Sequence, residues 1–304
     1  MQKSSLVTVC VISYNSEDYI LDALESIKRQ TYDNIELIIS DDCSNDSTKA
    51  ICLEWIESNS SRFVRAEFIS PVENMGTSCN YNRAANASKG DWIKYIDGDD
   101  LLADNCIEEN ISFVSNNPEA KVVFSQVSVF SEIGNLESQV FFNEKKKSLF
   151  DLDAKGQFMR LLLNNDLPSA SFFVNAQLIR ENPFDERYKL VEDAPKWIDL
   201  THKGNRFFYF DTVTAYYRKA ESATHGKKRY YNPIYIESLF QYVWDFKIPL
   251  LRQYNHQEAY TLCRQRVLII EFIFAVLKNR RNKFNDLILR VFSGLTHRLV
   301  KYKL

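Results

Sequence analysis

Acidic side chains gathered at three places are the residues of this sequence best suited to chemistry. They are Asp41 with Asp42, Asp97 with Asp99 and Asp100, and Glu192 with Asp193. Three carboxylates within the four residues 97–100, directly after the apolar run 92–96, repel one another unless a cation lies among them. Mg²⁺ or Mn²⁺ suits such oxygen ligands and is commonly held by one or two carboxylates and substrate phosphates. The turn at 97–100 therefore predicts a divalent metal and a diphosphate ligand, whose leaving charge the metal neutralises.

Each acidic group also has a purely structural interpretation. Residues 97–100 would form a solvated turn that caps a helix near Asp104, and residues 41–42 would be turn acids. Glu192 and Asp193 would start a helix, where negative charge is favoured. In the functional interpretation, a carboxylate at 41–42 accepts hydrogen bonds from a nucleotide base or ribose. From the residues alone, both interpretations stay open.

The first half of the chain alternates short apolar runs with helical patterns, which is typical of a mostly parallel, Rossmann-like α/β sheet flanked by helices. The predicted strands are 7–12, 35–40, 66–69, 92–96 and 121–130. Helices are predicted to begin at a cap of Asn15 or Ser16, at 46–48, and at about 78, the last ending at 87 with Gly90 as its C-cap. Ligands of open α/β sheets bind beyond the carboxyl ends of the strands, where the first two acidic groups fall.

The second half is predicted to be less regular and then helical. Residues 143–147 form an irregular charged stretch before a helix at 154–163, and we expect loops over an acceptor cleft here. From residue 233 the pattern predicts helices at 234–245, 257–278 and 282–303. We expect a catalytic domain over residues 1–225 and a helical extension over 226–304.

Composition narrows the classes of protein. A chain of 304 residues, 45% hydrophobic and 26% charged, can bury one large α/β core and a smaller appendage. The net charge of -2 gives no overall basic field, so no nucleic-acid partner is expected. The six cysteines show no metal-ligand spacing and indicate a reducing, cytoplasmic location. The longest apolar run, 267–277, is too short to cross a membrane.

Five ordered segments of the first 100 residues resemble glycosyltransferase family 2, whose catalytic domain has the GT-A fold. They are 7–15, 26–32, 38–48, 74–78 followed by Asn82, and the D-x-D-D turn at 97–100. In the third segment Cys43 stands where the family has glycine. The resemblance implies an inverting glycosyltransferase that uses a UDP-sugar donor with Mn²⁺ or Mg²⁺. It also implies that Tyr14 and Asp42 border the nucleotide, Asp97 lies near the ribose, and Asp99 binds the metal.

The resemblance continues more weakly to about residue 220. Residues 184–186 followed by Glu192-Asp193 resemble the family's F-D-E and E-D pair, which makes Asp193 the candidate catalytic base. An inverting transfer needs such a carboxylate on the acceptor side, opposite the leaving diphosphate. Many relatives place a metal-binding histidine soon after a Tyr-Arg pair, but here Ala220 occupies that position. His225 is the candidate replacement; the alternatives are Glu221, no further ligand, or a surface role for His225. Arg218 and Lys219 are the candidates to contact the diphosphate as it leaves.

The segment from Asn279 to the end is strongly basic, and Leu287, Val291 and Leu295 share one helical stripe. It could lie on an anionic membrane surface and bring the active site to a lipid-linked acceptor. Alternatively, it docks on the catalytic domain or on a second subunit, as in a homo-oligomer. The expected location is the cytoplasm, and the inner face of the cell membrane is the location that the membrane alternative implies.

The resulting hypothesis is transfer of a hexose or N-acetylhexosamine to a saccharide or lipid-linked saccharide in surface polysaccharide (O-antigen or capsule) biosynthesis. A sugar-phosphate nucleotidyltransferase would use similar carboxylates and Mg²⁺, but the N-terminus has no glycine-rich, lysine-containing phosphate loop. A non-catalytic module that binds sugar nucleotides is the third alternative.

Overall fold

A computed structural model describes residues 4–131, 139–164, 167–219 and 229–301, with side chains described as far as residue 292. The chain divides into two compact units. The first comprises Met1–Glu186 and Glu192–Lys219, and the second comprises Arg187–Val191 and Ala220–Leu304. None of the described helices is both long and apolar enough to cross a bilayer.

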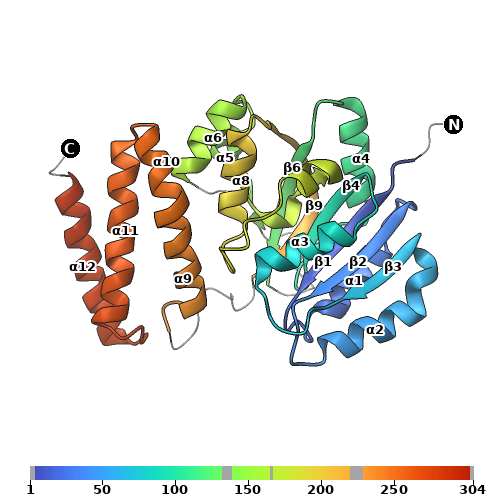
Figure 1. The fold of residues 1–304 in the computed structure, drawn as a ribbon, viewed down its shortest axis with the longest axis horizontal. Coiled ribbons are helices and arrows are strands. Elements are labelled where there is room, and N and C mark those ends of the chain that lie inside the picture. The colour runs from blue at the N-terminus through green and yellow to red at the C-terminus, as the bar shows by residue number, and fades with distance from the viewer. Residues whose placement is uncertain (1–3, 132–138, 165–166, 220–228, 302–304) are drawn as a thin grey trace. The chain divides into compact units, whose positions relative to one another are not determined.

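A mixed sheet forms the centre of the first unit (Figure 1). Its strands in the described residues are β1 Val7–Ser13, β2 Ile35–Asp41, β3 Arg65–Ile69, β4 Trp92–Asp97, β5 Leu101–Leu102, β6 Val122–Phe130, β7 Gln139–Val140, β8 Phe173–Asn175 and β9 Phe207–Arg218. Their order is β3-β2-β1-β4-β8-β6-β9-β5, with β7 paired to β6. The first four strands are parallel, β8 is antiparallel to both β4 and β6, and β9 runs parallel to β6.

Helices flank this sheet and make up most of the second unit. In the first unit they are α1 Ile20–Lys28, α2 Thr48–Asn59, α3 Thr77–Ala87, α4 Cys106–Asn116, α5 Glu144–Lys147, α6 Ala154–Leu163, α7 Ala176–Glu181 and α8 Asp193–His202. Short 3-10 helices lie at Ser60–Arg62 and Ser169–Ser171. In the second unit, α9 Pro233–Tyr242, a π-helical turn Val243–Lys247, α10 Ile248–Gln253, α11 Gln257–Ala275 and α12 Lys283–Lys301 follow one another. The predicted α/β class with C-terminal helices is confirmed.

The hydrophobic core explains why the first strands and helices were predictable. Alternate residues of β1, including Val9 and Val11, pack against the inner face of α1. On that helix Ile20, Leu24 and Ile27 recur at the predicted helical spacing and have no exposed surface. Burying each such side chain contributes about 1.5–3 kcal/mol. The predicted strands are confirmed, with ends that differ by one residue.

Two predicted helix caps are wrong. Helix α1 begins at Ile20 without a side-chain cap. Asn15 has a φ of 50° and its Oδ1 accepts a hydrogen bond from the Asn45 N–H, so this side chain ties the end of β1 to the loop after β2. Helix α3 has its C-cap at Ser88, and Gly90 serves close packing: a Cβ there would lie 2.6 Å from Thr8 Oγ1.

The second half contains more regular structure than predicted. The charged stretch after Asn143 is the short helix α5, which Asn143 caps by accepting a hydrogen bond from the Lys146 N–H. The helix predicted at 154–163 is confirmed as α6, capped by Asp153. The sequence analysis did not predict α10, which has Pro249 in its first turn. Lys278 and Asn279, at φ of 51° and 54°, follow α11, which ends earlier than predicted.

Candidate functional site

The parallel register brings the ends of three strands to one edge of the sheet. Ser13 at the end of β1 pairs with Asp41 of β2, and Ile12 pairs with Asp97 of β4. The main chain of Ser13 also accepts a hydrogen bond of 2.9 Å from the Asp42 N–H. The first two acidic groups therefore lie on either side of β1, at the carboxyl ends of the strands, where the sequence predicted them.

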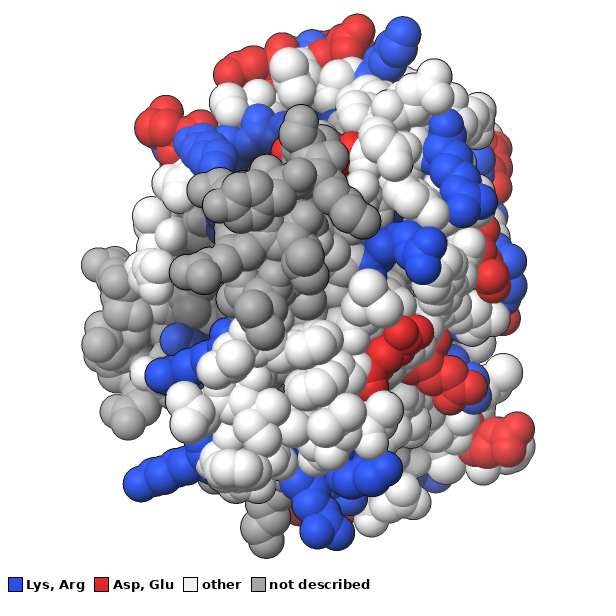
Figure 2. All heavy atoms as spheres, turned by 90° about the vertical axis from the view of Figure 1, so that its left-hand side faces the viewer, with Lys and Arg blue, Asp and Glu red and all other residues white. Residues whose placement is uncertain are grey.

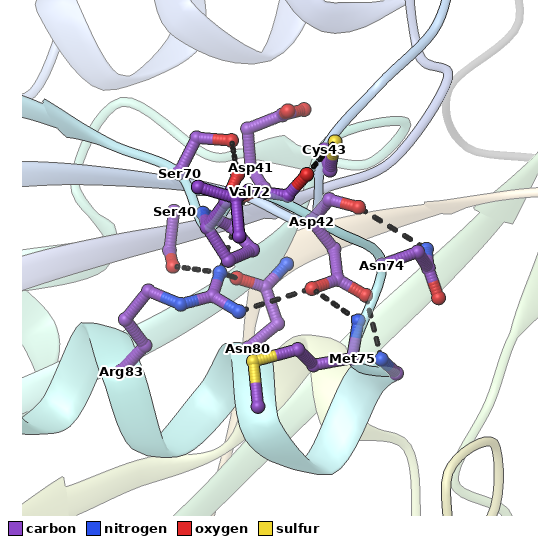
Figure 3. A network of polar contacts seen from close by, with 12 residues as sticks. Ser40, Asp41, Asp42, Cys43, Ser70, Val72, Asn74, Met75, Asn80 and Arg83 are labelled. Carbon is purple, nitrogen blue, oxygen red and sulfur yellow. Dashed lines mark hydrogen bonds and ion pairs between the residues drawn. The ribbon is translucent and has the colours of Figure 1, made fainter.

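Asp42 is buried and fully engaged by the protein (Figure 3). Its Oδ1 accepts from the Met75 N–H at 3.2 Å and from Arg83 Nη2 at 3.0 Å, and its Oδ2 accepts from the Gly76 N–H at 2.7 Å. Asn74 Nδ2 donates to the Asp42 carbonyl at 3.1 Å. The side chain of Asp42 thus holds the 74–76 loop, the segment that resembles the family's N-x-G motif, against the end of β2.

Asp41 is equally well satisfied. It accepts from the Ser44 N–H at 2.8 Å, from Ser44 Oγ at 2.5 Å and from Ser13 Oγ at 3.1 Å. Cys43, which follows Asp42 in the same loop, has a φ of 63°, the left-handed conformation that favours glycine. Tyr14, which follows β1 at the same edge, is 46% exposed and is therefore accessible to a ligand.

The turn after β4 is crowded and buried rather than solvated. Asp97 accepts from Tyr81 Oη at 3.0 Å, yet burial and the charge of Asp99 raise its pKa to about 7. Burial raises the pKa of Asp99 as well, and Arg218 opposes that rise. Asp100 is 1% exposed, and its Oδ2 is buried without a hydrogen-bond partner. The interpretation of this turn as a solvated helix cap is therefore wrong.

The third acidic group lies close enough to interact with this turn. Burial raises the pKa of Glu192 to about 8, with further contributions from the charges of Asp193 and Asp97. Asp193 is the first residue of α8, and its Oδ1 accepts from the Ala194 N–H at 2.5 Å. The structure thus brings together Asp97, Asp99 and Asp193, and it also confirms that Glu192 and Asp193 start a helix.

Sequence analysis missed the contacts that connect these acids. The Tyr81 ring lies 4.8 Å from that of Phe184, so the residue that donates to Asp97 also supports the 182–186 loop. Asn82 clamps this loop, because its Oδ1 accepts from the Phe184 N–H at 2.8 Å and its Nδ2 donates to the Phe184 carbonyl at 2.9 Å. The position of Asn82 in the motif at 74–82 was the one signal in the sequence for this clamp.

Lys196 of α8 fixes the same loop from the other side. Its Nζ donates to the carbonyls of Asn182 at 2.7 Å and Pro183 at 2.6 Å, and it lies 5.0 Å from the centre of the Phe184 ring. Burial lowers the pKa of Lys196 to about 8. Since Lys196 lies one turn after Asp193, the loop contacts set the position of the helix that carries the candidate base.

Arg218 contacts protein groups on all sides. Its N–H donates to Asp100 Oδ1 at 2.8 Å, and its Nε donates to the Asp99 carbonyl at 2.7 Å. Its Nη2 pairs with Asp22 at 3.2 Å, and the guanidinium lies over the rings of Tyr19 and Phe130. These contacts hold the acidic turn in place, and a diphosphate contact for Arg218 remains a prediction. His225 lies outside the described residues.

The residues present fit a divalent cation that is completed by a ligand. Within the described ranges, no group of three or more His, Cys, Asp or Glu side chains is arranged as a metal site by itself. The unpartnered Oδ2 of Asp100 and the repulsion between Asp97 and Asp99 nevertheless mark a set of hard oxygen donors in which Arg218 and Lys94 offset only part of the negative charge. Such a set suits Mg²⁺ or Mn²⁺ bound together with substrate phosphates.

Residues 8–180 match the sequence model of glycosyl transferase family 2, and the chain belongs to this family. One curated relative is the Escherichia coli protein named UDP-Glc:alpha-D-GlcNAc-diphosphoundecaprenol beta-1,3-glucosyltransferase WfgD. It is 26% identical over 200 residues, which is 66% of this chain and 71% of that protein. Other relatives extend beyond the matched part: the chain spans 66% of the length of one and 19% of another.

Solved structures show the same fold. S. aureus TarS 1-349 in complex with UDP-GlcNAc has a TM-score of 0.56 and 19% identity, covering 89% of this chain and 81% of that chain. The mannosyltransferase PcManGT from Pyrobaculum calidifontis, in complex with GDP-Man and Mn²⁺, has a TM-score of 0.55 and 15% identity, covering 97% of this chain and 81% of that chain. These likenesses establish the GT-A fold and, at such identities, nothing finer.

Proposed function

We propose that this chain is an inverting glycosyltransferase that transfers a hexose or N-acetylhexosamine from a UDP-sugar to an acceptor hydroxyl. The observation that carries the proposal is the convergence of Asp97, Asp99, Glu192 and Asp193 at one edge of a family 2 sheet. Burial, together with the charges of neighbouring carboxylates, raises the pKa values of Asp97 and Glu192 there. Uncompensated acids at a ligand-binding edge are typical of a catalytic centre.

The donor would bind between the two strand ends. Tyr14 offers an exposed ring for the nucleotide, while Asp42 keeps the 74–76 loop in place beside it. Asp97 would bind near the ribose, and Asp99 would hold Mg²⁺ or Mn²⁺. When bound, the metal supplies Lewis-acid stabilisation of the leaving diphosphate. The Mn²⁺ in the PcManGT complex and the UDP-GlcNAc in the TarS complex support this assignment by fold alone.

Asp193 would act as the general base. It accepts the proton of the acceptor hydroxyl while the hydroxyl oxygen attacks the anomeric carbon from the face opposite the diphosphate. The bond from that carbon to the diphosphate oxygen breaks, its electron pair stays with the diphosphate, and the configuration inverts. Glu192, with a pKa of about 8, stays protonated at neutral pH and adds no negative charge beside Asp193.

The acceptor is proposed to be a lipid-linked saccharide in surface polysaccharide biosynthesis, such as O-antigen or capsule. The name of WfgD, which includes a diphosphoundecaprenol-linked acceptor, supports this class. We propose a catalytic domain over residues 1–225 and a helical extension over 226–304 that meets the inner face of an anionic membrane. The enzyme would then work in the cytoplasm, as a monomer or as a homo-oligomer.

The test compares Asp193→Asn and Asp99→Asn with the wild-type protein. UDP release is measured from UDP-glucose, UDP-galactose and UDP-GlcNAc with Mn²⁺, in water and with lipid-linked saccharide acceptors. We expect Asp193→Asn to bind UDP normally and to lose at least about a hundredfold in transfer, the typical contribution of a general base. Asp99→Asn should lose the Mn²⁺-dependent part of UDP binding.

Three outcomes would contradict the proposal. Near-normal transfer by both variants would exclude the assigned roles. Release of pyrophosphate from UTP and a sugar phosphate would favour a nucleotidyltransferase. Binding of UDP-sugars without turnover on any acceptor would favour a non-catalytic module.

A further inference from the structure

Helix α12 packs on the second unit through one face only. Ile288 and Leu289 lie against the apolar cluster around Ile273 of α11, and the Phe292 ring stacks on Phe272 with ring centres 3.9 Å apart. Asp286 also faces inward, where its Oδ1 accepts from Tyr230 Oη at 2.7 Å. This face supplies the packing that holds α12 in place.

The opposite face of α12 is apolar and uncovered. Phe284, Leu287 and Val291 are 70%, 60% and 58% exposed. Their spacing of three and then four residues places them on a single stripe of the helix. The sequence prediction of a membrane-surface helix needs an apolar stripe and basic residues, and this stripe meets the first requirement. Leu295, which is predicted to extend the stripe, lies outside the described side chains.

Exposed cations lie on α12 and in the segment just before it. They are Lys278, Arg280, Arg281, Lys283 and Arg290. The one acidic residue between 278 and 292 is Asp286, and it is turned inward to Tyr230. Figure 2 shows blue Lys and Arg side chains beside pale surface. Positive charge is therefore concentrated locally in a chain whose net charge is -2.

We infer that this surface docks on an anionic lipid bilayer; it is called the α12 face and consists of Phe284, Leu287, Val291 and the five cations. The inference rests on the proposed function, because docking would place the enzyme beside a lipid-linked acceptor. Each Lys or Arg near an anionic leaflet strengthens binding by about fivefold, and the apolar side chains enter the headgroup region.

Charge decides against a second copy of the chain as the occupant. In a two-fold symmetric dimer the same patch contacts itself, so the cations of one α12 face would meet those of the other. Within residues 278–292 five cations stand against the single acid Asp286, so the excess charge has the same sign on both copies. An anionic lipid surface supplies the opposite charge continuously along the stripe.

The experiment measures co-sedimentation of the full chain with vesicles of phosphatidylcholine alone and of phosphatidylcholine with phosphatidylglycerol. We expect binding to the anionic vesicles that is weakened by salt, and at least about tenfold weaker binding to neutral vesicles. The double variant Phe284→Ser/Leu287→Ser should lose about tenfold in binding, and Arg280→Gln/Arg281→Gln/Lys283→Gln should lose about a hundredfold. Val72→Ser, which removes an apolar side chain that is 98% exposed elsewhere, is the matched control and should bind as the wild type does.

The outcomes separate docking from catalysis. Absence of wild-type binding to anionic vesicles, or equal binding by wild type and both multiple variants, would overturn the inference. So would a change of oligomeric state in the Phe284→Ser/Leu287→Ser variant, measured by analytical ultracentrifugation, since that identifies the face as a subunit interface. Hydrolysis of UDP-glucose without vesicles should be unchanged in these variants. If the wild type binds vesicles but hydrolyses no UDP-sugar and transfers to no acceptor, the proposed function fails and the docking surface stands.

Discussion

The carboxylates at the end of β2 and those after β4 lie at the same edge of one sheet, yet they are in opposite electrostatic situations. Asp41 and Asp42 each accept three hydrogen bonds from neighbouring donors. Asp100 is as buried as they are and Asp97 is partly buried, and burial together with neighbouring acids raises the pKa values of both. The same residue type therefore holds a loop in place in one region and forms a site with excess negative charge in the other.

This difference separates positioning from chemistry. A buried carboxylate with a full set of donors stabilises the fold and has little capacity left for a ligand. A buried carboxylate beside other carboxylates destabilises the fold until a cation or a proton arrives. The second region is thus the part of the molecule that gains most from binding a metal with a diphosphate.

The largest expected effect comes from removing charge in the two regions separately. Asp42→Asn should lower the free energy of unfolding by about 3 kcal/mol, because Arg83 loses its partner and a backbone N–H loses its acceptor in a buried site. Asp97→Asn should raise the free energy of unfolding in metal-free buffer by about 1 kcal/mol, because it relieves repulsion from Asp99. Urea unfolding in the presence of EDTA measures both.

Arg83→Gln is the control for Asp42→Asn and should reproduce part of its loss of stability. The Asp97→Asn variant keeps its contact with Tyr81, because the amide oxygen of Asn can still accept that hydrogen bond. Equal destabilisation by Asp42→Asn and Asp97→Asn would remove the distinction between the two regions.

The pH dependence of metal binding gives the second prediction. The pKa values of Asp97 and Glu192, about 7 and about 8, exceed their ordinary values, so the folded protein binds more protons than the unfolded chain between about pH 4 and 8. The free energy of unfolding of the metal-free protein therefore falls as pH rises through this range. A cation binds the ionised carboxylates, so its affinity should rise with pH, by up to about tenfold per pH unit for each proton released.

Thermal unfolding with and without Mn²⁺ and UDP, at pH 6 and pH 8, measures this effect. The increase in Tm on adding both ligands should be larger at pH 8. Asp97→Asn should reduce the difference between the two pH values, whereas Arg83→Gln should leave it unchanged. A ligand-induced increase that is the same at pH 6 and pH 8 would contradict the assignment of the crowded acids as the metal site.

Sequence reasoning succeeded where local pattern determines structure. The spacing of Ile20, Leu24 and Ile27 fixed the inner face of α1, and strand ends located the acids at 41–42 and 97–100. It could not find contacts between distant segments. The hydrogen bond from Tyr81 to Asp97 and the antiparallel insertion of β8 between β4 and β6 depend on tertiary packing, which leaves no periodic signal.

The same limit applies to the roles of individual site residues. Asp42 and Arg218 were assigned to ligands because their motifs resemble those of the family. In the structure the Asp42 carboxylate is occupied by Arg83 and backbone amides. The polar groups of Arg218 are occupied by Asp22, the Asp99 carbonyl and the Asp100 side chain. The motifs therefore predicted where the site lies. Which of its residues hold loops in place and which have oxygens left for a ligand depends on tertiary contacts.

The smallest expected effect is at Cys43, in the loop after β2 where the carboxylates have their full set of hydrogen-bond donors. A side chain at a φ of 63° costs about 1 kcal/mol relative to glycine, and the weak contact from Sγ to the Val72 carbonyl, at 3.6 Å, offsets little of it. Cys43→Gly should therefore raise the free energy of unfolding by about 0.5 kcal/mol once the greater freedom of glycine in the unfolded chain is included. Cys43→Ala keeps the strain, loses the sulfur contact, and should destabilise slightly. If glycine proved more destabilising than alanine, the thiol itself would hold the loop after β2, and Cys43 would belong with Asp41 and Asp42 as a residue that holds a loop in place.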